Sequence, residues 1–249
     1  MIEEGTERIL FDPFFPLSNK IFKPSIEELS AANHILVTHG HFDHINGIPD
    51  IMSQECNNST VYCTKTPRDT LIKKGILDSR VRQIAVRDVL NIGPFEICVL
   101  KGKHIIFDKW LVAKTLFNLR MLAHLKNLKH IIKENKKCAE GGETVVYDIN
   151  ASNKRVLLMG SCSLDDNTEY PGAVDLLMLP FQGRSNICKY AMRFADRLKP
   201  KKIMLTHFDN SFPPISSFVN AAPFISAMEQ KYPDIPVICQ PASSEWVEI

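Results

Sequence analysis

The sequence predicts an α/β protein in which helices cover the faces of β-sheets. Short runs rich in β-branched and aliphatic residues recur in both halves of the 249-residue chain. Segments with apolar residues at helical spacing lie between these runs. The composition, 45% hydrophobic and 23% charged, is that of a globular protein with enough apolar residues for a sizeable core. Because strands and helices are interleaved, we expect the helices to pack on sheet faces.

Eight segments are predicted to be strands, since each is enriched in residues that suit a pleated surface. In chain order they are residues 8–11, 34–38, 60–62, 95–100, 144–149, 155–159, 176–179 and 203–206. The sequence Ala151-Ser152-Asn153-Lys154 leaves only a turn-length gap between two of them, which predicts a β-hairpin.

Three helices are predicted from their end signals. One begins near Thr66, an N-cap candidate followed by Pro67 and by an acid, Asp69, three residues after the cap. The second runs from Asn186 to Leu198 and ends before a proline. The third runs from Phe218 to Tyr232 and also ends before a proline.

A basic segment interrupts this pattern. Residues 109–137 contain eight Lys or Arg residues and one acid, Glu134. Apolar residues recur at a spacing that fits one helical face: Leu111, Leu116, Leu119, Leu122, Leu125, Leu128 and Ile132. We expect residues 1–249 to form a single domain. Within it, we interpret residues 106–140 as an inserted amphipathic helix, which a kink could divide into two helices. It could pack on the core with its lysines in solvent, or it could be a lid, a subunit interface or a contact with an anionic membrane surface.

Charge and cysteine content limit the partners and the compartment. The net charge is only +2, so we expect no nucleic-acid partner. The seven cysteines are scattered without a Cys-x-x-Cys pair, which favours free thiols and a cytoplasmic protein. The acidic start has no apolar signal segment, and no run of about 18 uncharged apolar residues predicts a membrane span.

The most informative motif is His39-Gly40-His41-Phe42-Asp43-His44, which follows an apolar run. Imidazole nitrogens and a carboxylate are ligands that divalent metals accept. A strand places His39 and His41 on the same side because extended side chains repeat every two residues. Asp43 and His44 follow as the chain turns, so the motif suits two adjacent metal positions.

Further ligands are expected from other strand ends. His104 follows the strand predicted at 95–100, and His207 follows the strand predicted at 203–206. The remaining histidines, His34, His124 and His130, lie inside a strand or on the inserted segment, where a structural or solvent-exposed role is more common.

Together these elements resemble the metallo-β-lactamase superfamily, and specifically the branch of ascorbate-6-phosphate lactonase and N-acyl-phosphatidylethanolamine phospholipase D. The finer features are Asp12-Pro13-Phe14, the segment 179–183 and His207-Phe208-Asp209. The resemblance implies a four-layer αββα sandwich with metals in a cleft at one edge of the two sheets. It implies a first metal on His39, His41 and His104 and a second on Asp43, His44 and His207.

One position departs from the family pattern. The fourth motif of the family is Gly-Asp, and its carboxylate bridges the metals, whereas this chain has Gly160-Ser161-Cys162. The second metal could therefore bind weakly or not at all. Alternatively Cys162 supplies a thiolate, although it could equally be a small buried residue, or Asp165 or Asp166 reaches in from the following loop.

The chemistry expected of such a centre is hydrolysis. A metal ion held by three imidazoles lowers the pKa of a coordinated water to about 7 and polarises a carbonyl or phosphoryl oxygen. Asp43 is our candidate for orienting that water and accepting its proton, or for binding a second metal. Asp209 could orient the ring of a ligand histidine, or it could form a turn. Arg184 precedes a predicted helix and could bind an anionic group, or it could be an ordinary loop residue.

We therefore predict a hydrolase with one or two divalent ions, zinc first and manganese or iron as alternatives, acting on a small anionic ester, lactone or phosphoester. One alternative is a phosphodiesterase that acts on phospholipid or nucleic acid. Another is a metal-binding sensor or scaffold without catalysis, which the missing bridging aspartate would explain.

Overall fold

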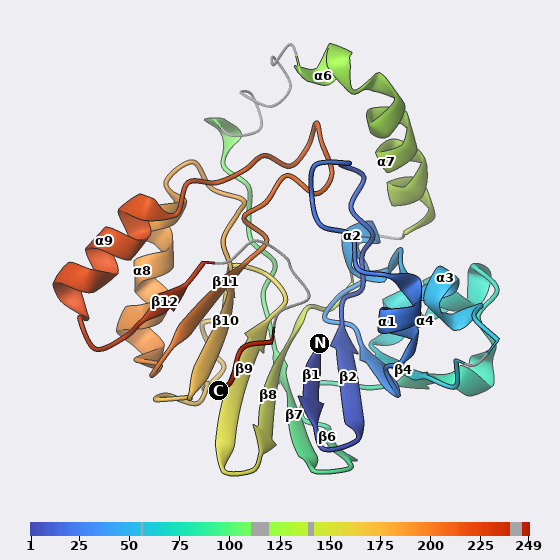
Figure 1. Ribbon diagram of the computed structural model, residues 1–249, viewed down its shortest axis with the longest axis horizontal. Coiled ribbons are helices and arrows are strands. Elements are labelled where there is room, and N and C mark those ends of the chain that lie inside the picture. The colour runs from blue at the N-terminus through green and yellow to red at the C-terminus, as the bar shows by residue number, and fades with distance from the viewer. Residues whose placement is uncertain (56, 111–119, 139–141, 240–245) are drawn as a thin grey trace.

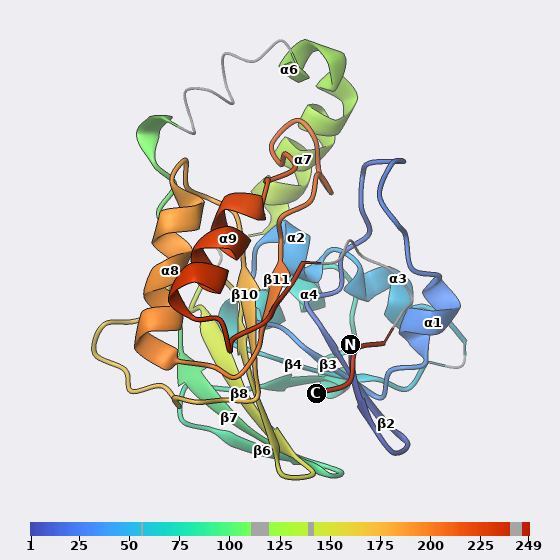
Figure 2. The same cartoon turned by 60° about the vertical axis from the view of Figure 1, so that its left-hand side comes forward.

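The computed structural model describes residues 1–55, 57–110, 120–138, 142–239 and 246–249. Two β-sheets stand face to face, and helices cover the outer face of each sheet (Figure 1). Figure 2 shows α8 and α9 side by side on one side of the sheets and α1 and α3 on the other. This is the four-layer αββα arrangement that the sequence predicts.

The first sheet has the strand order β1-β2-β3-β4-β5. Its strands are β1 (Ile2–Glu4), β2 (Glu7–Phe11), β3 (His34–Leu36), β4 (Thr60–Cys63) and β5 (Val81–Gln83). The β1–β2 pair is antiparallel and the other pairs are parallel. Parallel pairing brings the carboxyl ends of β2, β3 and β4 to the same edge of the sheet.

The second sheet has the strand order β12-β11-β10-β9-β8-β7-β6. Its strands are β6 (Val89–Ile92), β7 (Phe95–Lys101), β8 (Val145–Ala151), β9 (Lys154–Met159), β10 (Leu176–Pro180), β11 (Ile203–Thr206) and β12 (Val237–Ile238). The pairs from β6 to β9 are antiparallel, and those from β9 to β12 are parallel.

All eight predicted strands are present, and so is the predicted hairpin. Ala151 pairs with Lys154, and Ser152 and Asn153 have φ angles of 47° and 63°, as a two-residue turn with left-handed residues requires. The strands that were not predicted, β1, β5, β6 and β12, have two to four residues each. All four are edge strands of their sheets, and none of them has the longer apolar run that marks several of the central strands.

The described helices are α1 (Ile26–Ser30), α2 (Phe42–Ile45), α3 (Ile48–Met52), α4 (Lys65–Lys73), the 3-10 turn η1 (Asp78–Arg80), α6 (Arg120–Ala123), α7 (Leu125–Lys137), α8 (Ile187–Leu198) and α9 (Ala222–Lys231). The prediction for α8 is confirmed. The predicted start at Thr66 is wrong, because Thr64 is the N-cap and Pro67 lies within the first turn, where an amide N–H has no intrahelical partner. The predicted start at Phe218 is also wrong, because Pro223 occupies the first turn of α9.

Three buried clusters hold the layers together. Side chains of both sheets, such as Leu36 and Tyr147, form the middle layer. Ile45 and Leu71 belong to the cluster between the first sheet and its helices. Phe194 and Phe224 belong to the cluster beneath α8 and α9. Helices α4, α8 and α9 therefore use their apolar sides to cover a sheet face.

The basic segment forms α6 and α7 in its described part, and residues 111–119 and 139–141 lie outside that part. Leu125 and Ile132, on the face predicted to be apolar, are 48% and 47% exposed, whereas Ile131 is buried in the cluster of the first sheet. The interpretation of residues 106–140 as one inserted unit stays a prediction. Within the described ranges, no helix has the length and apolar character needed to cross a membrane.

Candidate metal centre

Six side chains gather at one edge of the two sheets in two groups. The nitrogens of His39, His41 and His104 lie within 4.8 Å of one another. The donor atoms of Asp43, His44 and His207 form a second group with the same spread. The two groups are adjacent, because the ring centroids of His39 and His44 are only 3.9 Å apart. These are the two sets that the sequence motif and its family resemblance imply.

Local structure explains why one short loop serves both groups. His41 is the N-cap residue of α2, so the chain changes from extended to helical within the motif. Phe42 and Ile45 are buried against the first sheet, which leaves Asp43 and His44 of the same turn for the second group. His207 follows β11 with a φ of +58°, a strained value for a residue that is not glycine.

Asp12, for which no site role was predicted, holds the ligand loop in place through Thr38 and His44. Its carboxylate accepts hydrogen bonds from the backbone N–H and the hydroxyl of Thr38, both at 2.7 Å. It also lies 2.8 Å from Nδ1 of His44. The signal was present in the Asp12-Pro13-Phe14 segment after β2, but a link across 26 residues has no periodic signature in the sequence.

These contacts fix which ring nitrogens face the centre. The Thr38 hydroxyl donates to Asp12, so its oxygen, 3.0 Å from Nδ1 of His39, can accept that ring's proton. Likewise His44 donates from Nδ1 to Asp12, and His104 donates from Nδ1 to the carbonyl of Ile105 at 2.8 Å. In His39 and His104, Nε2 then keeps its lone pair for a metal ion, whereas His44, whose charged form is favoured by Asp12 and Asp43, would release its Nε2 proton when it binds one.

Ser161 has a structural contact at the position of the missing aspartate. Its hydroxyl accepts a hydrogen bond from the backbone N–H of Ile105 at 2.9 Å. Ile105 also accepts the proton of His104, so Ser161 supports the segment that carries this ligand. Ser161 lines the same cavity as both groups. Its role as a further metal ligand stays a prediction.

The other residues that could compensate for the missing carboxylate are not among the clustered ligands. Cys162 lines the cavity of the metal centre, but it is 1% exposed within the core cluster of the second sheet, and burial raises the pKa of its thiol to about 12. Asp165 accepts a hydrogen bond from Thr168 and pairs with Lys101. Asp166 pairs with Lys103 at 2.9 Å. None of the three belongs to the two ligand groups found in the described residues.

Two further candidates also have defined contacts. The carboxylate of Asp209 accepts hydrogen bonds from the backbone and hydroxyl of Ser211, the turn geometry considered as its alternative role. Its charge also acts to raise the pKa of His207, although burial, the largest cause, lowers that pKa overall. Arg184 donates to the carbonyl of Ile106 and lines a neighbouring cavity rather than that of the ligand groups.

Burial and neighbouring charges set the protonation of the ligands. Burial lowers the pKa values of His39, His41 and His104, so the first group is neutral near pH 7. Burial opposes ionisation of Asp43, but the nearby imidazoles of His44 and His207 outweigh it and lower its pKa. Burial also disfavours the charged form of His44, but the carboxylates of Asp12 and Asp43 raise its pKa to about 9.

The residues fit a divalent metal ion. Nε2 of His39 is buried and has no hydrogen-bond partner among the described residues. An unsatisfied buried nitrogen is costly, and binding a metal ion would relieve that cost. Five imidazoles and one carboxylate are a donor set that zinc and similar ions accept. Both groups face a cavity of about 240 Å³, whose wall includes Asn135 of α7 and Phe107. A small substrate could therefore reach the ligands.

Comparison with known proteins identifies the family. The family model described as β-lactamase superfamily domain matches residues 7–208, which is most of the chain. The chain therefore belongs to the β-lactamase superfamily. A UPF0173 metal-dependent hydrolase of Pyrobaculum calidifontis is 30% identical over 95 residues, which is 37% of this chain and 40% of that protein. The chain thus matches less than half of the length of this curated relative.

Solved structures show the same fold at low sequence identity. The metallo-β-lactamase fold protein YhfI from Bacillus subtilis has a TM-score of 0.55 and 15% identity, covering 86% of this chain and 76% of that one. An isothiocyanate hydrolase from bacteria of the Delia radicum gut has a TM-score of 0.54 and 13% identity, covering 94% and 90%. These likenesses show that the chain has the metallo-β-lactamase fold.

Proposed function

We propose that this chain is a hydrolase that cleaves an ester, lactone or phosphoester bond in a small anionic substrate. The observation that carries the proposal is the pair of three-residue ligand groups on one cavity, with His39 Nε2 buried and unpartnered. A divalent metal bound there would supply Lewis acidity for activating water and polarising the substrate oxygen.

The protein groups have separate roles in this proposal. His39, His41 and His104 hold the first metal ion, while Thr38, held by Asp12, and the Ile105 carbonyl keep the rings of His39 and His104 in the required tautomers. Asp43 is ionised and lies at the cavity wall, so it can orient a water molecule and accept its proton. When a second metal ion is present, Asp43 binds it together with His44 and His207.

We propose zinc as the metal, with manganese or iron as alternatives, and tighter binding at the first group than at the second. The first group consists of three neutral imidazoles, which zinc favours. The second group lacks the shared carboxylate, because Ser161 occupies that position and its hydroxyl accepts a hydrogen bond from Ile105. A neutral oxygen leaves the second ion with less compensating charge.

Metal content measured per chain, together with hydrolysis of chromogenic esters and phosphodiesters, tests the proposal. The unaltered protein should contain at least one equivalent and should hydrolyse one of these classes. His39→Ala, His41→Ala or His104→Ala should remove the first metal and the activity, whereas His207→Ala should remove only the second. His130→Ala, an exposed histidine on α7, is the matched control and should change neither. Full metal content and rate in His39→Ala would overturn the ligand assignment.

A phospholipid substrate is a second candidate, because apolar side chains are exposed close to the cavity. Ile106, Phe107 and Trp110 follow His104 and are 74%, 52% and 70% exposed, and the lysines of α7 could face anionic lipid. Co-sedimentation with anionic vesicles that is lost in Trp110→Ser would support it.

We also propose a cytoplasmic location, since the six described cysteines are free thiols.

A further inference from the structure

A second cavity, of about 350 Å³, lies directly behind the wall of the metal centre. Three chain segments form this wall, and in each of them adjacent residues line opposite sides. Ile105, Cys162 and Gly183 line the cavity of the metal centre. Ile106, Ser163 and Arg184, the next residue in each segment, line the second cavity. His104 lines both, so a molecule in the second cavity would lie next to a metal ligand.

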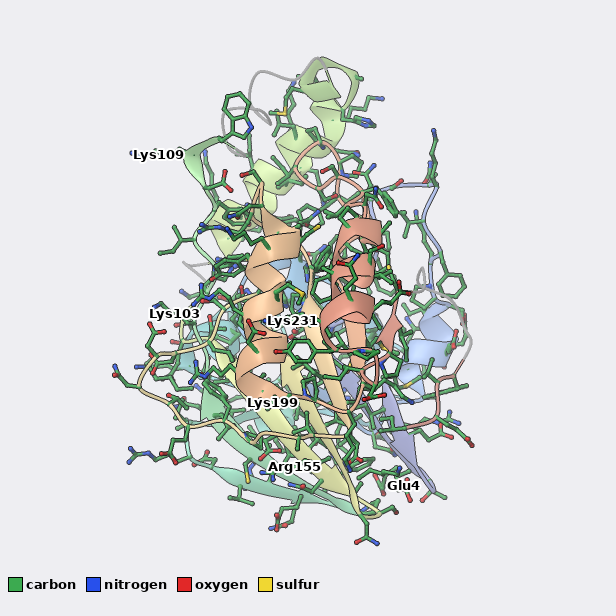
Figure 3. All side chains as sticks on the ribbon, turned by 90° about the vertical axis from the view of Figure 1, so that its left-hand side faces the viewer. Glu4, Lys103, Lys109, Arg155, Lys199 and Lys231 are labelled. Carbon is green, nitrogen blue, oxygen red and sulfur yellow. The ribbon has the colours of Figure 1, made fainter. Side chains whose placement is uncertain are left out.

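The second cavity is strongly basic. Lys103, Arg184, Arg193 and Arg197 line it, and Asp166 is the only carboxylate among its described lining residues. Asp166 pairs with Lys103, which leaves the charge of three arginines without a carboxylate partner in the cavity. Figure 3 faces α8, the helix that carries two of these arginines, and Lys103 lies beside it.

The arginines crowd one another in a way that an anion would relieve. The guanidinium groups of Arg184 and Arg193 both lie over the ring of Tyr190, each 4.9 Å from its centroid. Arg197 lies over the ring of Tyr170 and donates to the carbonyl of Thr168. Positive charges gathered in this way repel one another, and the attraction of each guanidinium group to a bound anion would offset that repulsion.

Arg184 is held in place but still has unused hydrogen-bonding capacity. One of its terminal nitrogens donates to the carbonyl of Ile106 at 3.2 Å, which fixes the guanidinium at the cavity wall. Its Nε is buried and has no hydrogen-bond partner among the described residues. A planar guanidinium that is already positioned loses little freedom when it binds phosphate oxygens.

We propose that this cavity is a binding site for a phosphate-type anion, either inorganic phosphate or the phosphate group of a small monoester. The three guanidinium groups match a doubly charged group with several acceptor oxygens. Tyr190, Phe194 and Ile106 add apolar surface that an organic remainder could contact. The site is made by side chains of this chain alone, so it requires neither the metal ion nor the hydrolase activity.

Titration of metal-depleted protein with inorganic phosphate and with phenyl phosphate, followed by calorimetry at fixed ionic strength, tests this site. Removal of the metal keeps phosphate from binding to a metal ion at the ligand groups, and circular dichroism first establishes that the metal-depleted protein is folded at the temperature of the titration. We expect one saturable site per chain. Arg193→Gln should weaken it by about tenfold, since an exposed arginine can be replaced without disturbing the core. Lys189 lies on the same helix but does not line the cavity. The Lys189→Gln variant therefore loses one positive charge of α8 and should still bind phosphate as tightly as the unaltered protein.

The two ligands distinguish the two sources of phosphate. Tighter binding of phenyl phosphate assigns the cavity to a phosphorylated organic molecule, and equal or tighter binding of inorganic phosphate assigns it to the free ion. Equal weakening in Arg193→Gln and Lys189→Gln would show general charge attraction and overturn the proposal. Absence of saturable binding in unaltered protein would also overturn it. Because the protein is metal-free throughout, neither result depends on the proposed hydrolase function.

Discussion

At the scale of single residues, the protonation of the site depends on one threonine and one aspartate. Thr38 has a single hydroxyl proton and gives it to Asp12, so the same oxygen is available to His39 only as an acceptor. Asp12 also holds His44, a ligand of the second group. One carboxylate therefore sets the orientation of a ring in each metal group, directly or through Thr38.

Asp12→Asn should weaken metal binding without unfolding the protein. The amide is nearly isosteric but neutral, so the charged partner that orients His44 is lost, and we expect about a 10- to 100-fold loss of affinity at the second group. Calorimetric titration with zinc measures it. Asp209→Asn is the matched control, since its hydrogen bonds go to Ser211, and it should change the affinity less than threefold. The reverse order of the two effects would contradict the assignment.

A second residue-scale prediction concerns Gly160. A Cβ at this position would lie 2.3 Å from both Cβ and Oγ1 of Thr38, so alanine cannot fit unless Thr38 moves. Gly160→Ala should cost about 1–3 kcal/mol in urea unfolding and should also reduce metal content. Gly172→Ala, where the nearest atom is 3.4 Å away, is a control that should leave both quantities nearly unchanged.

The six candidate ligands could be named from sequence, and four of them follow simple local rules. His39 and His41 follow the two-residue repeat of an extended chain, and His104 and His207 lie just beyond recognisable strands. Asp12 followed no such rule, because its partner Thr38 lies 26 residues away. Arg184 was a candidate from its place before a helix, but its contact with Ile106, 78 residues away, is visible only in the folded chain.

At the scale of elements, α7 is attached to the body of the protein by a largely buried ion pair. Glu134 accepts from Lys74, at the end of α4, at 3.1 Å and from Lys137 at 2.7 Å. Lys74 also reaches Asn46, next to α2. Since Asn135 lines the cavity of the metal centre, this attachment helps to place one wall of the site.

Acid should loosen α7 before the rest of the fold. Burial would raise the pKa of Glu134, but hydrogen bonds from Lys137 and Lys74 outweigh it, so the pKa is lowered on folding. The stabilisation is therefore complete above the ordinary glutamate range, near 4.3, and is lost as the pH falls through the lower folded value. Hydrogen exchange of residues 125–137 should rise over that interval.

Glu134→Gln should produce the same loosening at neutral pH and remove its pH dependence. Lys136→Gln alters an exposed lysine of the same helix and should exchange like the unaltered protein. If exchange in α7 rose with acid equally in Glu134→Gln and in the unaltered protein, another group would be responsible.

Helix ends were harder to predict than helix existence. Thr64 and Thr66 are both plausible caps, and the sequence around Pro67 satisfies either start. The choice between them is made by packing, which buries Pro67, Thr70 and Leu71 on the first sheet side. On α7, Ile131 and Ile132 are adjacent isoleucines. Only contact with the core cluster of the first sheet selects Ile131 for burial.

At the scale of the whole molecule, the metal groups join the two halves of the sandwich. His39 and His41 follow β3 of the first sheet, whereas His104 and His207 follow β7 and β11 of the second. The hydroxyl of Tyr147, on β8, donates to the carbonyl of Val37 and ties the sheets together beneath them. A metal ion on the first group would therefore bind folded protein and not the unfolded chain.

Removal of the metal should accordingly destabilise the whole fold. Ligand linkage gives about 4 kcal/mol when the free metal concentration is a thousand times its dissociation constant. Thermal unfolding with and without a chelator measures the effect, which should reappear on addition of zinc. His39→Ala should unfold at the lower temperature and should no longer respond to the chelator. His130→Ala should respond as the unaltered protein does. His39→Ala lacks one of the three ligands of the first group. A chelator response that survived in this variant would therefore show that the stabilising ion binds elsewhere.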